Sequence, residues 1–359
     1  MRCFLLLSLI SLTLPLFGQS IFDLLYRAPA TEAVDVVLTL PLDSLQATTR
    51  GPQVATLAFA DTTGDTRYLG LKVELRGRFR RSRCATPPLK LNFSKGELRD
   101  AGLAEFDKLK LVNTCYDDST ATALLLKEYL AYRAYALLSP DAHYRTQLLR
   151  LTYRDAAGRT PDRTGYAFIL EDTDEMAARN GGKEVDAPAG LTSERYDPVA
   201  EATHALFQYL IANGDWSLPL HRNVKVIADA DGRLVPVGYD FDFSGWVGAP
   251  YASPAADVGQ QSIFQRVYLG FDQSDRTLRG VNQSFRSNRR TLLRLIDDFT
   301  LIDVRERRVL QRFVQRFYDD LATMSSSTSV LMYDQLRGTT ADIIPSGGRA
   351  ADYGASSRR

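Results

Sequence analysis

The sequence predicts an α+β protein with two lobes, a β-rich N-terminal lobe that carries one long helix and a mainly helical C-terminal lobe. Three observations lead to this class. Strand-like runs fill the first part of the 359-residue chain, helical periodicity dominates after residue 172, and the two kinds of element are segregated rather than alternating. Segregation favours an α+β class over a doubly wound sheet. The chain is also long enough to build a core in each lobe.

The N-terminal strands are expected where β-branched or alternating apolar runs are separated by turn residues. These runs are "VDVVLTL" from residue 34, "QVATLAFA" from 53, "LKVEL" from 71, "LKLNF" from 89 and "KLKLV" from 108. A long helix follows in "DDSTATALLLKEYLAYRAYALLS", whose Asp, Ser and Thr residues are candidate N-caps. Two more strands, "TQLLRLTYRD" and "GYAFILED", complete this part.

The second half is mostly helical, with one hairpin. Helices are expected in "TDEMAARNGG", "VAEATHALFQYLIAN", "NRRTLLRLIDD" and "DVRERRVLQRFVQRFYDDLATM". Between them, "NVKVIA" and "RLVPVGY" are joined by "DADG", and Asp-Gly is a strong hairpin signal. We therefore divide the chain into a signal peptide at 1–18, an N-terminal β-rich lobe at 19–172, a C-terminal helical lobe with the hairpin at 173–337 and a flexible tail at 338–359.

The first residues have the composition of an export signal. "MRCFLLLSLISLTLPLFGQS" has one early Arg, a short apolar run and small residues near Gly18, which predicts a cleaved secretory signal; the alternative is an uncleaved N-terminal anchor. We expect a periplasmic, cell-envelope or secreted protein. No later run reaches the length of a membrane span, and a net charge of +1 gives no bulk electrostatic reason for nucleic-acid binding.

Two cysteines remain after signal removal, Cys84 and Cys115. Both lie beside predicted strands, and an exported chain meets an oxidising environment, so the pair is either a disulfide or two partly buried thiols. Two cysteines and three scattered histidines do not make a zinc pattern.

A pair of acids closes the second strand of the hairpin. With a period of two, Asp240 and Asp242 project together while Phe241 and Phe243 face the other way. Two like charges this close repel unless a cation lies between them. They are either ligands of a divalent ion such as Mg²⁺ or structural groups, acting as helix caps or as partners of buried arginines.

The hairpin also brings Asn223, at its start, near Asp240, at its end. Asp215 follows the preceding helix and should reach the same edge. An Asp that can accept a hydroxyl proton, together with an Asn and an Asp that can hold a metal, is the arrangement that phosphoryl transfer uses. The catalytic loop of protein kinases has the same order of Asp, Asn, hairpin and Asp.

Other charged residues extend this comparison. Lys90 lies on a strand before the long helix, Glu128 lies on that helix and can pair with it, and Glu171 ends the linker strand. Several arginines follow one another closely, and we expect their side chains to alternate between the two faces of a strand. They either bind phosphate, with Arg76 as the first candidate, or form a solvated face. This basic run consists of Arg76, Arg78, Arg80, Arg81 and Arg83.

From about residue 34 to 320 the chain resembles the spore-coat protein CotH family, whose members have an atypical protein-kinase-like fold. The matching segments are "ELRGRFRRSRCATPPLKLNF", "GYAFILEDTDEMAARNG", "LIANGDWSLPLHRN" and "PVGYDFDFSG". The Gly-x-Gly-x-x-Gly loop and the His-Arg-Asp triplet of protein kinases are absent, and Asp242 stands where those enzymes have glycine.

This resemblance implies binding of ATP with Mg²⁺ or Mn²⁺ and transfer of phosphate to Ser or Thr of a protein substrate. Asp215 would then be the catalytic base, Asn223, Asp240 and Asp242 the metal ligands, and Lys90 the phosphate contact held by Glu128. Arg76 and Glu171 would complete the cofactor site. The alternative is an envelope or surface protein that keeps the fold as a non-catalytic binding scaffold.

Overall fold

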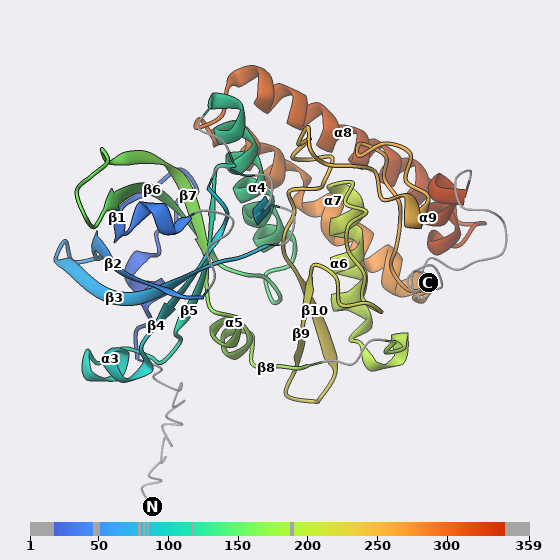
Figure 1. Ribbon diagram of the computed structural model, residues 1–359. Helices are drawn as coiled ribbons and strands as arrows, with labels where there is room; N and C mark the ends of the chain where they lie inside the picture. The colour runs from blue at the N-terminus through green and yellow to red at the C-terminus, as the bar shows by residue number, and fades with distance from the viewer. Residues whose placement is uncertain are drawn as a thin grey trace, which may run out of the picture.

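The computed structural model of the protein describes residues 18–45, 51–77, 80–81, 84, 86–115, 118–186 and 190–341 (Figure 1). The expected signal peptide lies outside these residues except for Gly18, and the expected tail lies outside them from residue 342 onward. The beginning of that tail belongs to helix α9 (Met332–Ala341). Within the described part of the chain, no helix combines the length and apolarity that crossing a bilayer requires.

Seven strands form a closed barrel with the order β1-β2-β3-β4-β5-β7-β6. They are β1 Val34–Leu40, β2 Gln53–Ala60, β3 Thr66–Leu75, β4 Leu89–Phe93, β5 Lys108–Asn113, β6 Thr146–Asp155 and β7 Arg163–Leu170. Neighbours pair antiparallel except for β1 and β6, whose parallel register runs from Val34 opposite Leu149 to Leu40 opposite Asp155.

The closed barrel shows that the predicted fold class is wrong; that class was a two-lobed kinase-like fold with a β-rich N-terminal lobe carrying one long helix and a mainly helical C-terminal lobe. The local pattern located the strands well, because the period of two is a property of each strand alone. The local pattern could not show that β1 pairs with β6, which lies far along the chain. This parallel pair is the contact that closes the barrel.

The barrel encloses its own core. On β4, Leu89, Leu91 and Phe93 point inward and are at most 4% exposed. Helix α1 (Ile21–Leu25) adds four buried residues to the same cluster. Ser20 caps α1 and donates its hydroxyl to Glu175, which fixes the start of the described chain near α5 (Thr173–Arg179).

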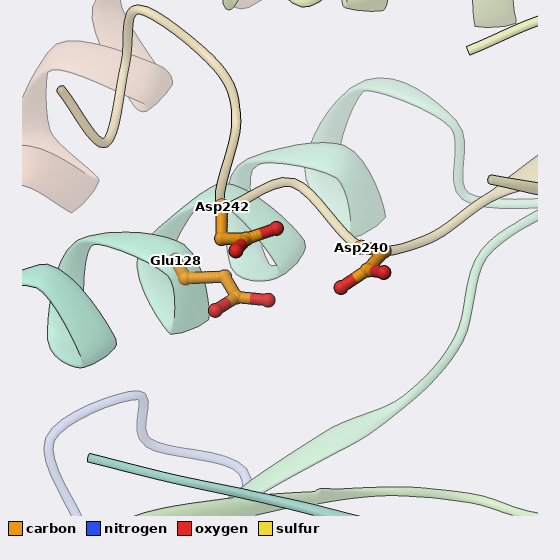
Figure 2. A group of neighbouring side chains, drawn as sticks. All are labelled: Glu128, Asp240 and Asp242. Carbon is orange, nitrogen blue, oxygen red and sulfur yellow. The ribbon is translucent and has the colours of Figure 1, made fainter. Parts of the chain in front are cut away.

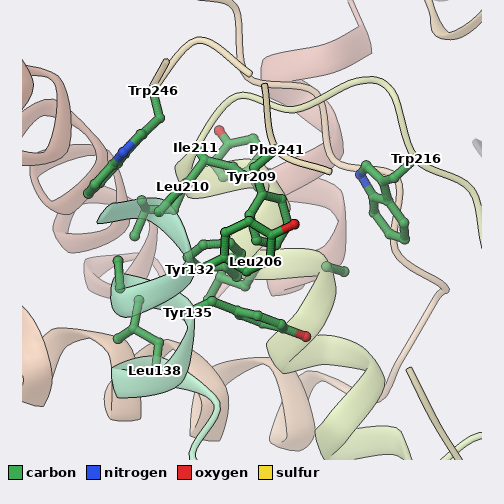
Figure 3. Packing of buried hydrophobic residues seen from close by; sticks show 14 of the residues in the cluster. Tyr132, Tyr135, Leu138, Leu206, Tyr209, Leu210, Ile211, Trp216, Phe241 and Trp246 are labelled. Atoms are coloured by element: carbon green, nitrogen blue, oxygen red, sulfur yellow. The ribbon is translucent and has the colours of Figure 1, made fainter. Parts of the chain in front are cut away.

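A second, larger core surrounds α4 (Ser119–Leu138). Apolar residues are distributed around all sides of this helix, as is typical of a helix buried between other elements. It packs against the outer face of β6 and β7 and against α6 and α7, so its tyrosines meet Phe207, Phe241 and other aromatic rings (Figures 1 and 3).

The remaining elements include predicted helices and the predicted hairpin, together with a short helix at Lys95–Asp100 and a short strand at Lys183–Glu184 that were not predicted. The helices are α3 Lys95–Asp100, α6 Pro198–Leu210, α7 Asp275–Asp298 and α8 Val304–Ser326, and β8 Lys183–Glu184, β9 Val224–Ala228 and β10 Leu234–Gly238 form a three-stranded sheet. Short 3-10 turns occur at Leu42–Leu45, Ser193–Arg195 and Ala256–Val258. Helix α7 begins thirteen residues before the predicted Asn288, because the polar stretch that opens it hides the apolar stripe of Leu278, Val281 and Phe285.

The disulfide interpretation of the cysteines is confirmed. Cys84 and Cys115 are bonded, with their Cα atoms 4.4 Å apart. The bond ties the segment after β3 to the segment that leads into α4.

We predict that free-thiol labelling of a chain expressed without residues 1–18 labels neither Cys84 nor Cys115 in the absence of reductant. Replacing both by serine should lower the free energy of unfolding by ~2–4 kcal/mol, because the unfolded chain regains the entropy of the loop that the bond closes. The reduced and denatured protein is the positive control. Full labelling without reductant would contradict the bond.

Candidate functional site

The predicted hairpin, which carries the site, is present in the structure. Strand β10 pairs antiparallel with β9 from Leu234 opposite Ala228 to Gly238 opposite Val224. The connecting turn is held by Asp229, whose carboxylate accepts from the backbone N–H groups of Asp231 and Arg233. Tyr239 N–H then donates to the carbonyl of Asn223 at 3.1 Å, so the start and the end of the hairpin lie side by side.

Asp215 and Asn223 are in direct contact. Asn223 Nδ2 donates to the Asp215 carbonyl at 2.6 Å and to Asp215 Oδ2 at 3.0 Å. Asn223 has a φ of +53°, in the left-handed region that asparagine tolerates better than most residues. From the other side, Asp215 N–H donates to the side chain of buried Asn213, which follows α6. The end of α6 and the hairpin therefore fix Asp215 together.

A buried aromatic ring sets the positions of the two acids after β10. The strand ends at Gly238 and Asp240 has a φ of +64°, so the continued strand alternation predicted through these residues is wrong. Phe241 is fully buried, and its ring centroid lies 4.6 Å from that of Tyr132 on α4. The N–H of Asp240 donates to the Tyr132 hydroxyl at 2.7 Å. The directions of both carboxylates are therefore set by packing against α4 and not by strand geometry alone.

Three acids meet beside α4. Carboxylate oxygens of Glu128, Asp240 and Asp242 all lie within 4.8 Å of one another, and Figure 2 shows the three groups pointing into a common space. Glu128 lies one helical turn before Tyr132, so the same face of α4 contributes an acid and the hydroxyl that holds Asp240.

Arg80 neutralises part of this cluster. Its terminal nitrogen lies 2.6 Å from Glu128 Oε2 and 2.8 Å from Asp242 Oδ2, and its Nε donates to Asp242 at 3.0 Å. The Arg80 side chain is 11% exposed, and those of its two partners are still more buried. Glu128 therefore pairs with Arg80, whereas the sequence had suggested Lys90.

Two cavities meet at Arg80. The smaller, of about 270 Å³, brings together five of the predicted site residues, one of which is Arg76, with Arg80; the larger has about 440 Å³. The smaller is lined by Arg76, Gly77, Arg80, Pro88, Val112, Asp215, Asn223, Asp240, Asp242 and Phe243. The larger is lined by Arg80, Asn113, Thr114, Cys115, Asp118, Thr120, Ala121, Leu124, Leu125, Glu128, Pro250 and Tyr251.

Two predicted site residues lie elsewhere. Lys90 is on the outer face of the barrel, opposite Glu74 on β3 and Lys110 on β5, and does not line either cavity. Glu171 is fully buried and accepts hydrogen bonds from Arg145 and Arg179. Its contacts are those of a structural ion-pair centre between β6 and α5.

Arg80 is the residue that sequence reasoning undervalued. The predicted alternation of the basic run along a strand is wrong, since β3 ends at Leu75 and Arg80 and Arg81 are helical; Arg78 and Arg83 lie outside the described residues. No local signal distinguishes Arg80 from its neighbours. The sequence analysis pointed to such a residue only through one alternative, in which Asp240 and Asp242 pair with buried arginines. Asp242 does pair with Arg80.

Burial changes the acidity of these groups. Burial raises the pKa of Asp215 to about 6, with added repulsion from Asp240 and Asp242 and an opposing effect of Arg222, 3.4 Å away. Burial likewise raises the pKa of Asp242, against the pull of Arg80. In Glu128, burial again outweighs Arg80 and raises the pKa to about 7. A further cation in the smaller cavity would therefore favour the charged forms.

The donor set fits a hard divalent cation. Carboxylate and amide oxygens are the ligands that Mg²⁺ and Mn²⁺ take, and Asp240, Asp242 and Asn223 present them to one cavity. Glu128 Oε1 is buried and has no hydrogen-bond partner in the described part of the chain, so it is an unsatisfied acceptor next to the same carboxylates. Glu128, Asp240 and Asp242 have carboxylate oxygens close enough together to hold the ion, and Asn223 lines the same cavity as the two Asp residues.

No model of a known protein family matches this sequence, and a comparison with curated proteins also gives no match. The resemblance to the CotH family therefore stays a prediction.

We predict that Arg80→Met lowers the free energy of unfolding by ~3–5 kcal/mol at pH 7, because it leaves two buried acids without their partner. Urea denaturation of the variant and the wild type measures the loss. The matched control is the triple change Arg80→Met, Glu128→Gln and Asp242→Asn, which removes the unpaired charges and should recover a large part of that loss. An equal loss in both variants would show that the charges are not the cause.

Proposed function

We propose that this chain is a divalent-metal-dependent phosphotransferase that uses ATP and phosphorylates Ser or Thr of a protein, as its resemblance to the CotH family implies. The observation that supports this most is the smaller cavity, which joins Asp215, Asn223 and Asp240 to Arg76 and Arg80. A base, oxygen ligands for a metal and guanidinium groups for phosphate are the parts that phosphoryl transfer needs. The proposal rests on these residues and not on a kinase-like fold.

Each group has a role that follows from its surroundings. Asp215 is held by Asn223 and Asn213, and with a pKa raised to about 6 it is largely ionised at neutral pH and still basic enough to accept a hydroxyl proton. When bound, the metal would neutralise phosphate charge between the donor and the acceptor. Arg76 and Arg80 would orient the phosphate oxygens.

The larger cavity offers a place for the acceptor. It adjoins the smaller one at Arg80, and its wall combines apolar Ala121, Leu124 and Leu125 with polar Asn113. Asn113 Oδ1 is buried and has no hydrogen-bond partner among the residues that the structure describes, so a hydroxyl or amide donor of an incoming segment would satisfy it.

A second candidate function is a non-catalytic binding scaffold, and one observation favours it. Arg80 already pairs with both Glu128 and Asp242, so two of the three clustered acids have a partner without a metal. In that case the acids stabilise the contact between α4 and the segment after the hairpin, and the cavity is not a catalytic site.

We predict that Mg²⁺ with ATP raises the melting temperature of the wild type and that Asp240→Asn abolishes this stabilisation. A ligand at 100 times its dissociation constant stabilises by roughly 2.7 kcal/mol, which thermal-shift measurements detect readily. Without ligand, Asp240→Asn should be as stable as the wild type or more so, because it removes repulsion between neighbouring carboxylates.

Asp231→Asn is the matched control, since Asp231 lies in the turn of the same hairpin and does not line the cavity. It should keep the ligand response. A wild type that shows no response to Mg²⁺-ATP or Mn²⁺-ATP, together with a large loss of ligand-free stability in Asp240→Asn, would favour the scaffold function instead.

We also predict that Asp215→Asn lowers the rate of phosphate transfer by roughly 10²–10⁴-fold, the usual contribution of a general base. The wild-type rate should rise with pH up to about 6 and then level off, because the base acts only when deprotonated and burial raises its pKa to about 6. Transfer of labelled γ-phosphate to a degenerate Ser/Thr peptide library measures both. Asp257→Asn is the control, because Asp257 also pairs with Arg222 but lies outside the cavity; an equal drop in that variant would exclude Asp215 as the base.

A further inference from the structure

A row of arginines marks a surface that the proposed reaction does not use. Arg286, Arg289, Arg290 and Arg294 occupy one face of α7 at helical spacing. With Leu293 they line an open pocket of about 460 Å³ to which α8, the neighbouring helix (Figure 1), contributes Gln311. The other lining residues are Ser287 and Asp297.

The charge of this pocket is one-sided. Among the described residues that line the pocket, Asp297 is the only acid, and it accepts a hydrogen bond from Gln311 at 3.2 Å. Within the described part of the chain, no ion pair or hydrogen bond joins the side chains of Arg286, Arg290 or Arg294 to another residue. The whole chain has a net charge of only +1, so this excess of positive charge is local.

The close spacing of these arginines destabilises α7 when no anion is bound to it. The pairs Arg286–Arg290 and Arg290–Arg294 are four residues apart, where like charges on a helix repel and destabilise it. An anionic ligand would remove this repulsion, and guanidinium groups bind carboxylates and phosphates in the strong bidentate geometry.

The shape of the pocket favours an extended chain. Its lining spans residues 286–297 of α7, which at 1.5 Å per residue is roughly 16 Å. An extended peptide rises about 3.3 Å per residue, so about five residues cover that length. Leu293 provides an apolar patch between the charges.

Other occupants fit less well. The chain's own last residues, 342–359, contain two Asp and three Arg and do not complement a basic surface. None of the described residues that line the pocket has an aromatic side chain on which nucleic-acid bases could stack. A bilayer surface is flat, whereas this site is a hollow between two helices.

We propose that the pocket between α7 and α8 docks an extended segment of a partner protein about five residues long and rich in Asp and Glu. The proposal is independent of the phosphotransferase function, because none of these residues lines either of the cavities that meet at Arg80.

The test is the anisotropy of a fluorescein-labelled peptide, acetyl-Glu-Glu-Ala-Glu-Glu-Ala-Glu-Glu-amide, titrated with the full chain. Binding should weaken steeply between 50 and 300 mM NaCl, since screening acts on exposed charges. The variant Arg286→Gln, Arg290→Gln and Arg294→Gln should lose at least about tenfold in affinity, which corresponds to 1.4 kcal/mol. The peptide with Gln in place of Glu should not bind.

The matched control removes the same charge from another face. Arg305, Arg308 and Arg312 on α8 are exposed and do not line the pocket, so their change to Gln should alter affinity less than twofold. Equal losses in the two triple variants, or absence of peptide binding, would overturn the proposal. So would tighter binding to anionic phosphatidylglycerol vesicles or to single-stranded DNA through the same arginines. The α7 variant should retain the wild-type response to Mg²⁺-ATP, so failure of docking and failure of the phosphotransferase proposal give different results.

Discussion

The ion pairs that Arg80 makes with Glu128 and Asp242 join three segments that are far apart in the sequence. One follows β3, one is the middle of α4 and one follows β10. All three side chains are nearly or fully buried, so removing the Arg80 charge would leave two buried acids without a partner. The geometry of both cavities depends on this contact, because Arg80 forms part of the wall of each.

Helix α4 connects this charged contact to the hydrophobic core. Glu128 and Tyr132 lie on one of its faces, and Tyr135, in the next turn, receives a hydrogen bond from Gly238 at the end of β10. The apolar residues around the helix hold it between the barrel and the helical part. The disulfide of Cys84 and Cys115 lies close in sequence to both Arg80 and α4, so it restrains both ends of the contact.

Buried ion pairs are weak evidence for stability, because apolar residues of similar size often stabilise a core equally well. Here the ion pairs of Arg80 form part of the wall of the smaller cavity, so their role is to position the residues of that site. Asp240 is only partly buried and has no ion-pair partner among the described residues, while Asp215 lies opposite with a pKa raised to about 6. On α7, by contrast, Arg286, Arg290 and Arg294 are exposed and have no ion-pair partner among the described residues. The protein thus has a charge-balanced interior site and a charge-unbalanced surface.

The sequence by itself determined most strands and helices, the hairpin, and the grouping of Asp215, Asn223, Asp240 and Asp242, because these follow from local periodicity and from turns that join neighbouring segments. The closed barrel and the place of Arg80 were decided only by the tertiary structure. A period of two shows that Lys90 and Leu89 lie on opposite faces of a strand, but it does not show what packs against each face. Pairing between distant segments depends on the whole set of packing contacts, and that information is not present in any short stretch of the chain.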